Sequence, residues 1–233
     1  MIEELFGLTE LHLTILPSGQ RLHKDIISDF KAMQTAAAGA GFDLQVASGF
    51  RDFSRQKMIW NNKFSGQRAV LDLSGNIIDI NALTNEEKVI SILTFSALPG
   101  LSRHHWGTDF DFYDAGNLPD NYQLKLEEHE YINDGPCSGL SKWLKLNMDQ
   151  FGFNAPYSVY NGGIAREPWH LSHIETAAKY ELELSNLKKD LFSQVCQEQQ
   201  VLGATEIIKN LELILTKYVF NTSSKAITNK VNK

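Results

Sequence analysis

Apolar positions recur along the chain with two different spacings, and the two spacings alternate through most of the sequence. Recurrence roughly every three or four residues predicts amphipathic helices, whereas strict alternation of apolar and polar residues predicts half-buried strands. Short segments of both kinds in one chain indicate an α+β fold. The predicted helices are residues 23–38, 53–64, 84–97 and 140–151, and the predicted strands are residues 42–48 and 108–113, with a strand or extended arm at residues 11–16.

The clearest alternation follows a turn within the sequence SRHHWGTDFDFYD, at residues 102–114. Asp109 and Asp111 fall on one face of the predicted strand, and Phe110 and Phe112 fall on the other. The pattern therefore predicts a strand with one apolar face and one acidic face.

The C-terminal part of the chain has a different character. Its pattern is helical from residue 174 to about residue 220, and Gly203 marks a break. The last dozen residues, TSSKAITNKVNK, are polar and predict a frayed tail.

Composition narrows the class of protein. The chain has 233 residues, of which 42% are hydrophobic and 21% charged, as in ordinary globular proteins. The net charge is -6 and no basic stripe offers a phosphate footprint, so no nucleic-acid partner is expected. No apolar run has the length of a membrane span. The acidic N-terminus does not resemble a secretory signal, which favours a cytoplasmic location, or a periplasmic one if an export signal precedes residue 1.

The two cysteines, Cys137 and Cys196, are far apart and form no CxxC motif. Free, buried thiols are the ordinary behaviour of such residues. A zinc site built on cysteines is therefore excluded.

Histidines and acids occur in two clusters that suit a metal site of another kind. His104 lies in the turn before the acidic strand, and His170 follows Glu167 by three residues. Catalytic zinc takes three protein ligands and keeps one position open for water, and two histidines with one carboxylate fit that number. A further carboxylate that is not a ligand can act as base, and Arg51 can stabilise an oxyanion or bind a carboxylate.

Each of these motifs is weak alone, but their order along the chain is specific. The stretches SGFRDFSRQ, SRHHWGTDFD and EPWH resemble the D-alanyl-D-alanine carboxypeptidase family of zinc peptidases. This family includes the vancomycin-resistance carboxypeptidases, and it shares its fold with lysostaphin-type endopeptidases and the hedgehog signalling domain. The family pattern reads S-G-[YF]-R-x4-Q, then S-x-H-x2-G-x-A-x-D, then E-x-W-H. The resemblance covers about residues 45–173.

The resemblance implies a role for each matching residue. His104, Asp111 and His170 would hold Zn²⁺, and Glu167 would be the base that activates water. Arg51 would stabilise the tetrahedral oxyanion. The residues that would hold or shape the site for the substrate's terminal residue are Ser102, Gln56 and Trp169.

This sequence departs from the family pattern at Asp109, where the family usually has a small residue. Asp109 shares a face with Asp111, so it could be an acid behind the ligands, a partner for Arg103 or a rival ligand. The spacing from His104 favours Asp111 over Asp109 as the metal ligand. His105 also competes with His104, and the family spacing selects His104.

In fold, the resemblance implies a small, mostly antiparallel sheet that carries the zinc site on one face, with helices on the other. Residues 1–173 would form the zinc carboxypeptidase domain, and residues 174–233 a helical extension with the frayed tail.

The implied activity is a zinc-dependent D,D-carboxypeptidase that removes the C-terminal D-alanine of peptidoglycan stem peptides. Three alternatives remain: an L,D-carboxypeptidase acting on murein tetrapeptides, a D-Ala-D-Ala dipeptidase, and a catalytically silent zinc-binding module.

Overall fold

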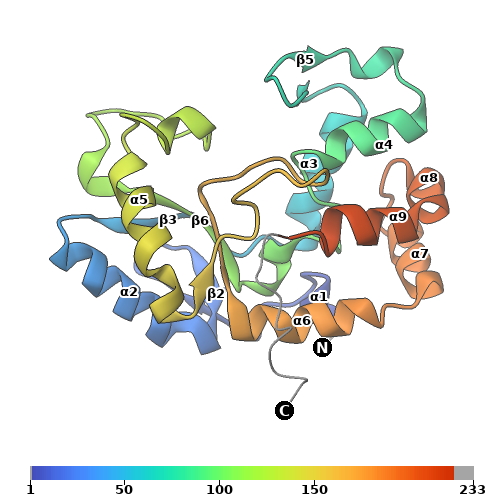
Figure 1. Ribbon diagram of the computed structural model, residues 1–233. Helices are drawn as coiled ribbons and strands as arrows, with labels where there is room; N and C mark the ends of the chain where they lie inside the picture. Colours follow the sequence, from blue (N-terminus) through green and yellow to red (C-terminus); the bar gives the residue numbers. More distant parts are fainter. Residues whose placement is uncertain (1, 223–233) are drawn as a thin grey trace.

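The computed structural model describes residues 2–222, and its centre is a sheet of four antiparallel strands in the order β3-β6-β8-β7 (Figure 1). These strands are Leu44–Ser48, Asp109–Asp114, His170–His173 and Phe153–Asn154. Strand β6 pairs with both β3 and β8, with Asp111 opposite His170 and Asp109 opposite Ser172. The sheet therefore brings the motif at residues 102–114 beside the one at residues 167–170.

The two faces of this sheet differ as the alternation in β6 predicts. Phe110 and Phe112 are buried in one hydrophobic core together with Leu171 of β8. Asp109 and Asp111 are buried on the opposite face. An apolar face thus anchors the sheet, and an acidic face carries the polar site.

Two helices cover the apolar face, α2 (Ile27–Gly39) and α5 (Ser138–Asn147). Phe30 and Met33 of α2 and Leu140 and Leu144 of α5 lie in the same core as the sheet phenylalanines. The ring of Phe30 meets that of Phe110 edge-on at 5.2 Å between centroids. This packing confirms the α+β fold with helices on one side of a small antiparallel sheet.

A second hydrophobic core lies among the helices outside this layer. Trp60 of α3, Ile92 of α4, Phe192 of α7 and Ile207 of α8 are fully buried in it. In Figure 1 these helices form a group on the right, and the orange α6 runs along the bottom between the two groups. The group on the right consists of α3 (Phe53–Phe64), α4 (Asn85–Leu93), α7 (Lys189–Glu198), α8 (Ala204–Lys209) and α9 (Leu211–Ile214). The helix between the groups, α6, spans Ile174–Ser185.

Short elements complete the fold. The N-terminal helix α1 (Ile2–Leu5) precedes a hairpin of β1 (Leu13–Ile15) and β2 (Arg21–His23), and a second hairpin pairs β4 (Val70–Leu71) with β5 (Ile77–Ile78). Single turns of tighter helix link them. They include η1 (Lys24–Ile26), η2 (Ile80–Ala82), η3 (Arg103–Trp106), η4 (Ala115–Asn117), η5 (Glu128–Glu130) and η6 (Met148–Phe151), and the chain's last described turn is the π-helical η7 (Leu215–Val219).

The helix predicted over residues 84–97 begins at its capping box, in which Thr84 and Glu87 bond reciprocally, but it ends at Leu93. The carbonyl groups after that point have other partners. The carbonyl of Thr94 accepts from the backbone N–H of Ala165, and that of Ala97 accepts from the side chain of Gln56. Tertiary hydrogen bonds therefore replace the last helical turn.

The predicted C-terminal helix is divided into shorter helices rather than running nearly unbroken. Besides Gly203, Gln200 has a positive φ of 56°, a left-handed conformation that ends a helix.

The division of the chain at residue 173 stays a prediction. The predicted frayed tail, residues 222–233, lies outside the described residues apart from Thr222. Cys137 and Cys196 are free and buried. Over residues 2–222 no helix is long and apolar enough to cross a bilayer.

Candidate metal centre

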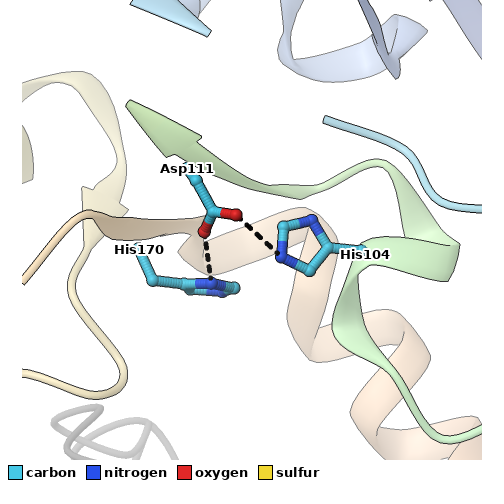
Figure 2. Close-up of side chains that lie close together, drawn as sticks. All are labelled: His104, Asp111 and His170. Carbon is cyan, nitrogen blue, oxygen red and sulfur yellow. Dashed lines mark hydrogen bonds and ion pairs between the residues drawn. The ribbon is translucent and has the colours of Figure 1, made fainter. Parts of the chain in front are cut away.

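Three buried side chains converge on the acidic face of the sheet. Figure 2 shows His104, Asp111 and His170 pointing toward one another from the η3 turn, strand β6 and strand β8. One ligand atom of each lies within 4.8 Å of those of the other two. Asp111 uses one oxygen toward each histidine, with Oδ2 3.6 Å from Nε2 of His104 and Oδ1 3.1 Å from Nδ1 of His170. The sequence expectation that these three residues share one site agrees with this placement.

The turn that carries His104 is held against the SGFR segment. The carbonyl of His104 accepts from the backbone N–H of Arg51 at 3.0 Å, and Nδ1 of His104 lies 2.8 Å from the carbonyl oxygen of Gly49. A carbonyl can only accept, so Nδ1 carries the hydrogen and the lone pair of Nε2 faces Asp111. The two sequence motifs thus fix each other's position.

Gly107 ends this turn with a positive φ of 68°. A Cβ atom there would lie 2.5 Å from the side chain of Leu13 and 2.9 Å from the backbone nitrogen of His23. Only glycine permits this close approach of the β1-β2 hairpin, which explains the glycine of the motif.

The donor set fits a zinc ion. Burial lowers the pKa of His104 to about 3, so this imidazole is neutral and available as a ligand. Burial alone would raise the pKa of Asp111, but His104 and His170 reverse this and hold it low. Two imidazoles and one carboxylate are the kind and number of ligands that leave a fourth position of zinc open.

His170 is held from both sides. Its Nδ1 faces Asp111, and its Nε2 lies 3.0 Å from Oδ1 of Asp109. Although burial lowers the pKa of His170, its bonds to the two carboxylates raise the pKa to about 9. A metal ion that binds at Nδ1 therefore replaces a proton there.

Glu167 lies beside the three candidate ligands. Its Oε2 is 3.7 Å from Nδ1 of His170, and its side chain is 16% exposed. Burial raises the pKa of Glu167 to about 7. A carboxylate with this pKa can both take and return a proton near neutral pH, as a general base requires.

Arg51 supplies a partly buried positive charge to the same region. Its Nη1 donates to Oε1 of Gln56 at 2.9 Å, and its Nη2 donates to Oγ of Ser48 at 3.2 Å. Burial lowers the pKa of Arg51, while Asp111 and Glu167 oppose this effect. Within residues 2–222 no carboxylate lies within 4.0 Å of its guanidinium, so the charge is available for a substrate group.

The other predicted substrate residues are buried, but the structure does not place all of them on the side of the metal centre. Gln56 is fully buried and links Arg51 to the carbonyl of Ala97. Ser102 begins the turn that carries His104. Trp169 packs in the core of the apolar face, with its ring 5.6 Å from that of Tyr131. Their roles toward a substrate stay predictions.

The sequence did not indicate that two further residues, Tyr157 and Lys63, lie near the centre. The ring of Tyr157 meets that of His170 at 4.9 Å. Lys63 is 9% exposed, and its ammonium donates to Oγ of Ser96 at 2.8 Å. Burial lowers the pKa of Lys63 to about 8. The helical pattern of α3 places Lys63 on the same face as Gln56, which was the only available indication.

His105 has a structural position, distinct from that of its neighbour. Its Nε2 accepts from the backbone N–H of Gly100 at 2.9 Å, and its Nδ1 lies 2.6 Å from the carbonyl oxygen of Arg51. This pair of bonds requires a neutral ring, and burial lowers the pKa of His105 to about 4.

The neutral state of His105 predicts a loss of stability in acid. In the unfolded chain its pKa is about 6.5. Because the folded pKa is depressed, unfolding takes up a proton, and stability present at pH 7 is lost as the pH falls from 6.5 toward 4. Between pH 7 and pH 5 the wild type should lose about 2 kcal/mol more unfolding free energy than His105→Gln, measured by urea unfolding of zinc-free protein. Equal losses in the two proteins would contradict this role.

Known proteins resemble this chain in sequence. A family model described as VanY, D-alanyl-D-alanine carboxypeptidase, matches residues 19–176. An uncharacterized protein of Haemophilus influenzae is 34% identical over 128 residues, 54% of this chain and 95% of its own length.

Two solved structures have a similar fold. Vancomycin-resistance D,D-pentapeptidase VanY in complex with Zn(II) gives a TM-score of 0.50 at 23% identity, over 72% of this chain and 83% of that one. The LD-carboxypeptidase LdcB gives a TM-score of 0.52 at 22% identity, over 78% of this chain and 77% of that one.

The fold and the centre agree with a metallopeptidase, in which a carboxylate lies beside three groups suited to zinc. The chain belongs to the VanY family of D-alanyl-D-alanine carboxypeptidases, since the family model matches well over half of it. This confirms the family and the enzyme class, a metallopeptidase of the carboxypeptidase kind, that were expected from the sequence.

Proposed function

We propose that this protein is a zinc-dependent D,D-carboxypeptidase that removes the C-terminal D-alanine of peptidoglycan stem peptides. The observation that carries the proposal is Glu167, a partly buried carboxylate of raised pKa whose Oε2 lies 3.7 Å from Nδ1 of His170 in the candidate zinc site. Zinc, when bound by His104, Asp111 and His170, would act as a Lewis acid that lowers the pKa of a bound water to about 7.

The residues of the chain would divide the remaining tasks. Glu167 takes the proton of the attacking water and returns it to the nitrogen of the leaving D-alanine as the peptide bond breaks. Arg51 donates hydrogen bonds to the scissile carbonyl oxygen as negative charge develops on it. Gln56 and Ser48 hold the guanidinium in place, so little rearrangement accompanies the reaction.

A comparison of substrates tests the proposal. Release of D-alanine is measured for a stem pentapeptide ending in D-Ala-D-Ala, a stem tetrapeptide and free D-Ala-D-Ala, each with chelator and after zinc is restored. The expected result is fastest release from the pentapeptide, loss with chelator and recovery with zinc. Faster release from the tetrapeptide would indicate an L,D-carboxypeptidase, and cleavage of the dipeptide alone a dipeptidase. No release from any of them would indicate a silent zinc-binding module.

A further inference from the structure

Asp109, the residue that departs from the family pattern, is completely buried behind the candidate zinc site. Its Oδ1 accepts from Nε of Arg103 at 2.6 Å and faces Nε2 of His170 at 3.0 Å. Its Oδ2 accepts from the hydroxyls of Thr108 at 2.7 Å and Ser172 at 3.1 Å. Both oxygens are thus occupied, and Asp109 faces the side of His170 that is turned away from Asp111.

Arg103 closes this arrangement. Its Nη2 donates to Oγ of Ser172 at 2.7 Å, and its Nη1 donates to Oε1 of Glu181. Its guanidinium also lies over the ring of Trp106, 4.9 Å from the centroid. Arg103, Asp109 and Ser172 therefore form a closed ring of hydrogen bonds, and Glu181 attaches that ring to α6.

The hydrogen bonds of this ring bear on which nitrogen of His170 keeps its hydrogen when a metal ion binds. An ionised carboxylate only accepts hydrogen bonds, so the nitrogen that faces Asp109 must carry a hydrogen. That nitrogen is Nε2, which keeps its hydrogen bonded to Asp109, so Nδ1, which faces Asp111 and Glu167, is the nitrogen that would give up its proton to a metal ion. A carboxylate behind a metal-bound histidine fixes the tautomer and the ring orientation in this way.

We propose that Asp109 is a positioning residue, held by Arg103 and Ser172, that fixes His170 with hydrogen on Nε2 and presents Nδ1 to zinc. The inference rests on the proposed zinc site but concerns residues that the family pattern does not include. Because Glu181 anchors Arg103, helix α6 contributes to the order of the metal centre through this ring.

Two measurements without any peptide test the inference. The first is the ¹⁵N spectrum of the histidine side chains in zinc-loaded protein, which should show His170 bound through Nδ1 and protonated at Nε2. Binding through Nε2 would overturn the proposal, and this measurement needs no variant. The second is the dissociation constant for zinc, measured by competition with a chromophoric chelator.

The variants then separate positioning from folding. Asp109→Ala should weaken zinc binding roughly 10–100-fold. Asp109→Asn should restore most of the affinity, because its amide oxygen still accepts from Nε2 and the hydroxyls of Thr108 and Ser172 can rotate to accept from its NH₂. Glu181→Gln should weaken zinc binding, but less than Asp109→Ala does. Glu183→Gln, a control at an exposed position of the same helix, should leave zinc binding unchanged.

The outcomes distinguish this inference from the proposed function. A wild type that binds no zinc would remove the basis of both. A wild type that binds zinc, with Asp109→Ala binding equally tightly, would overturn the positioning role alone. If Asp109→Ala does not fold, the wild-type nitrogen assignment and the order of Glu181→Gln and Glu183→Gln still decide.

Discussion

Replacing Glu167 with glutamine should lower kcat/KM for release of D-alanine by ~10²–10⁴-fold while zinc binding is retained. Glutamine keeps the size of the side chain but cannot accept the proton of the attacking water. Glu167 is not one of the three converging ligand residues, so its carboxylate is not needed to hold the ion. Activity is measured as D-alanine release, and zinc affinity by chelator competition on the same preparations.

A matched control separates this effect from a general change in charge. Glu175 lies exposed in the first turn of α6, and Glu175→Gln removes the same charge without touching the centre. This control should cleave at the wild-type rate. If Glu167→Gln also cleaved at that rate, Glu167 would not be the base, and another group would have to take the proton.

Replacing His104 with alanine should remove both zinc and activity. Loss of a partner behind a ligand typically weakens metal binding or activity 10–100-fold, so loss of a direct ligand should cost at least ~10²-fold in zinc affinity. Turnover should fall to the level of the chelated wild type, because the open zinc position depends on the three ligands. Zinc content after dialysis and D-alanine release are measured together.

The neighbouring histidine gives the comparison that this prediction needs. His105 bonds the backbone of Gly100 and Arg51 instead of facing Asp111, so His105→Gln should keep its zinc. Zinc retained in His104→Ala and lost in His105→Gln would reverse the assignment of the two histidines.

Much of the centre could be predicted from the sequence because its parts lie in compact motifs. The alternation in β6 placed Asp111 on the face opposite Phe110 and Phe112, and the structure agrees. The helices α2, α3 and α5 were found near the positions that apolar spacing predicted. The helix predicted from residue 23 starts only at Ile27, because residue 23 belongs to β2 and the turn η1 follows it. Helix α5 starts at Ser138, and its last turn, η6, is a tighter helix. Local patterns determine these elements, so local sequence reveals them.

The contacts behind the ligands could not be predicted, because they depend on strand register. The segment HLSH at residues 170–173 is too short and too polar to stand out as a strand, yet it pairs with β6 along Asp109 and Asp111. That pairing brings Ser172 opposite Asp109. Glu181 reaches Arg103 only through the path of α6. The sequence left Asp109 with three alternatives, and the structure favours two of them together: Asp109 is the partner of Arg103 and also the acid behind His170.

Titration of metal-free protein with zinc tests the central claim most directly. The release of D-alanine from a stem pentapeptide is followed as zinc is added in small steps, for the wild type and for His104→Ala. The wild type should gain activity in proportion to added zinc up to one equivalent per chain and then level off, and His104→Ala should gain none over the same range. Full activity in the chelated wild type, or equal recovery in the two proteins, would contradict a zinc centre built on His104, Asp111 and His170.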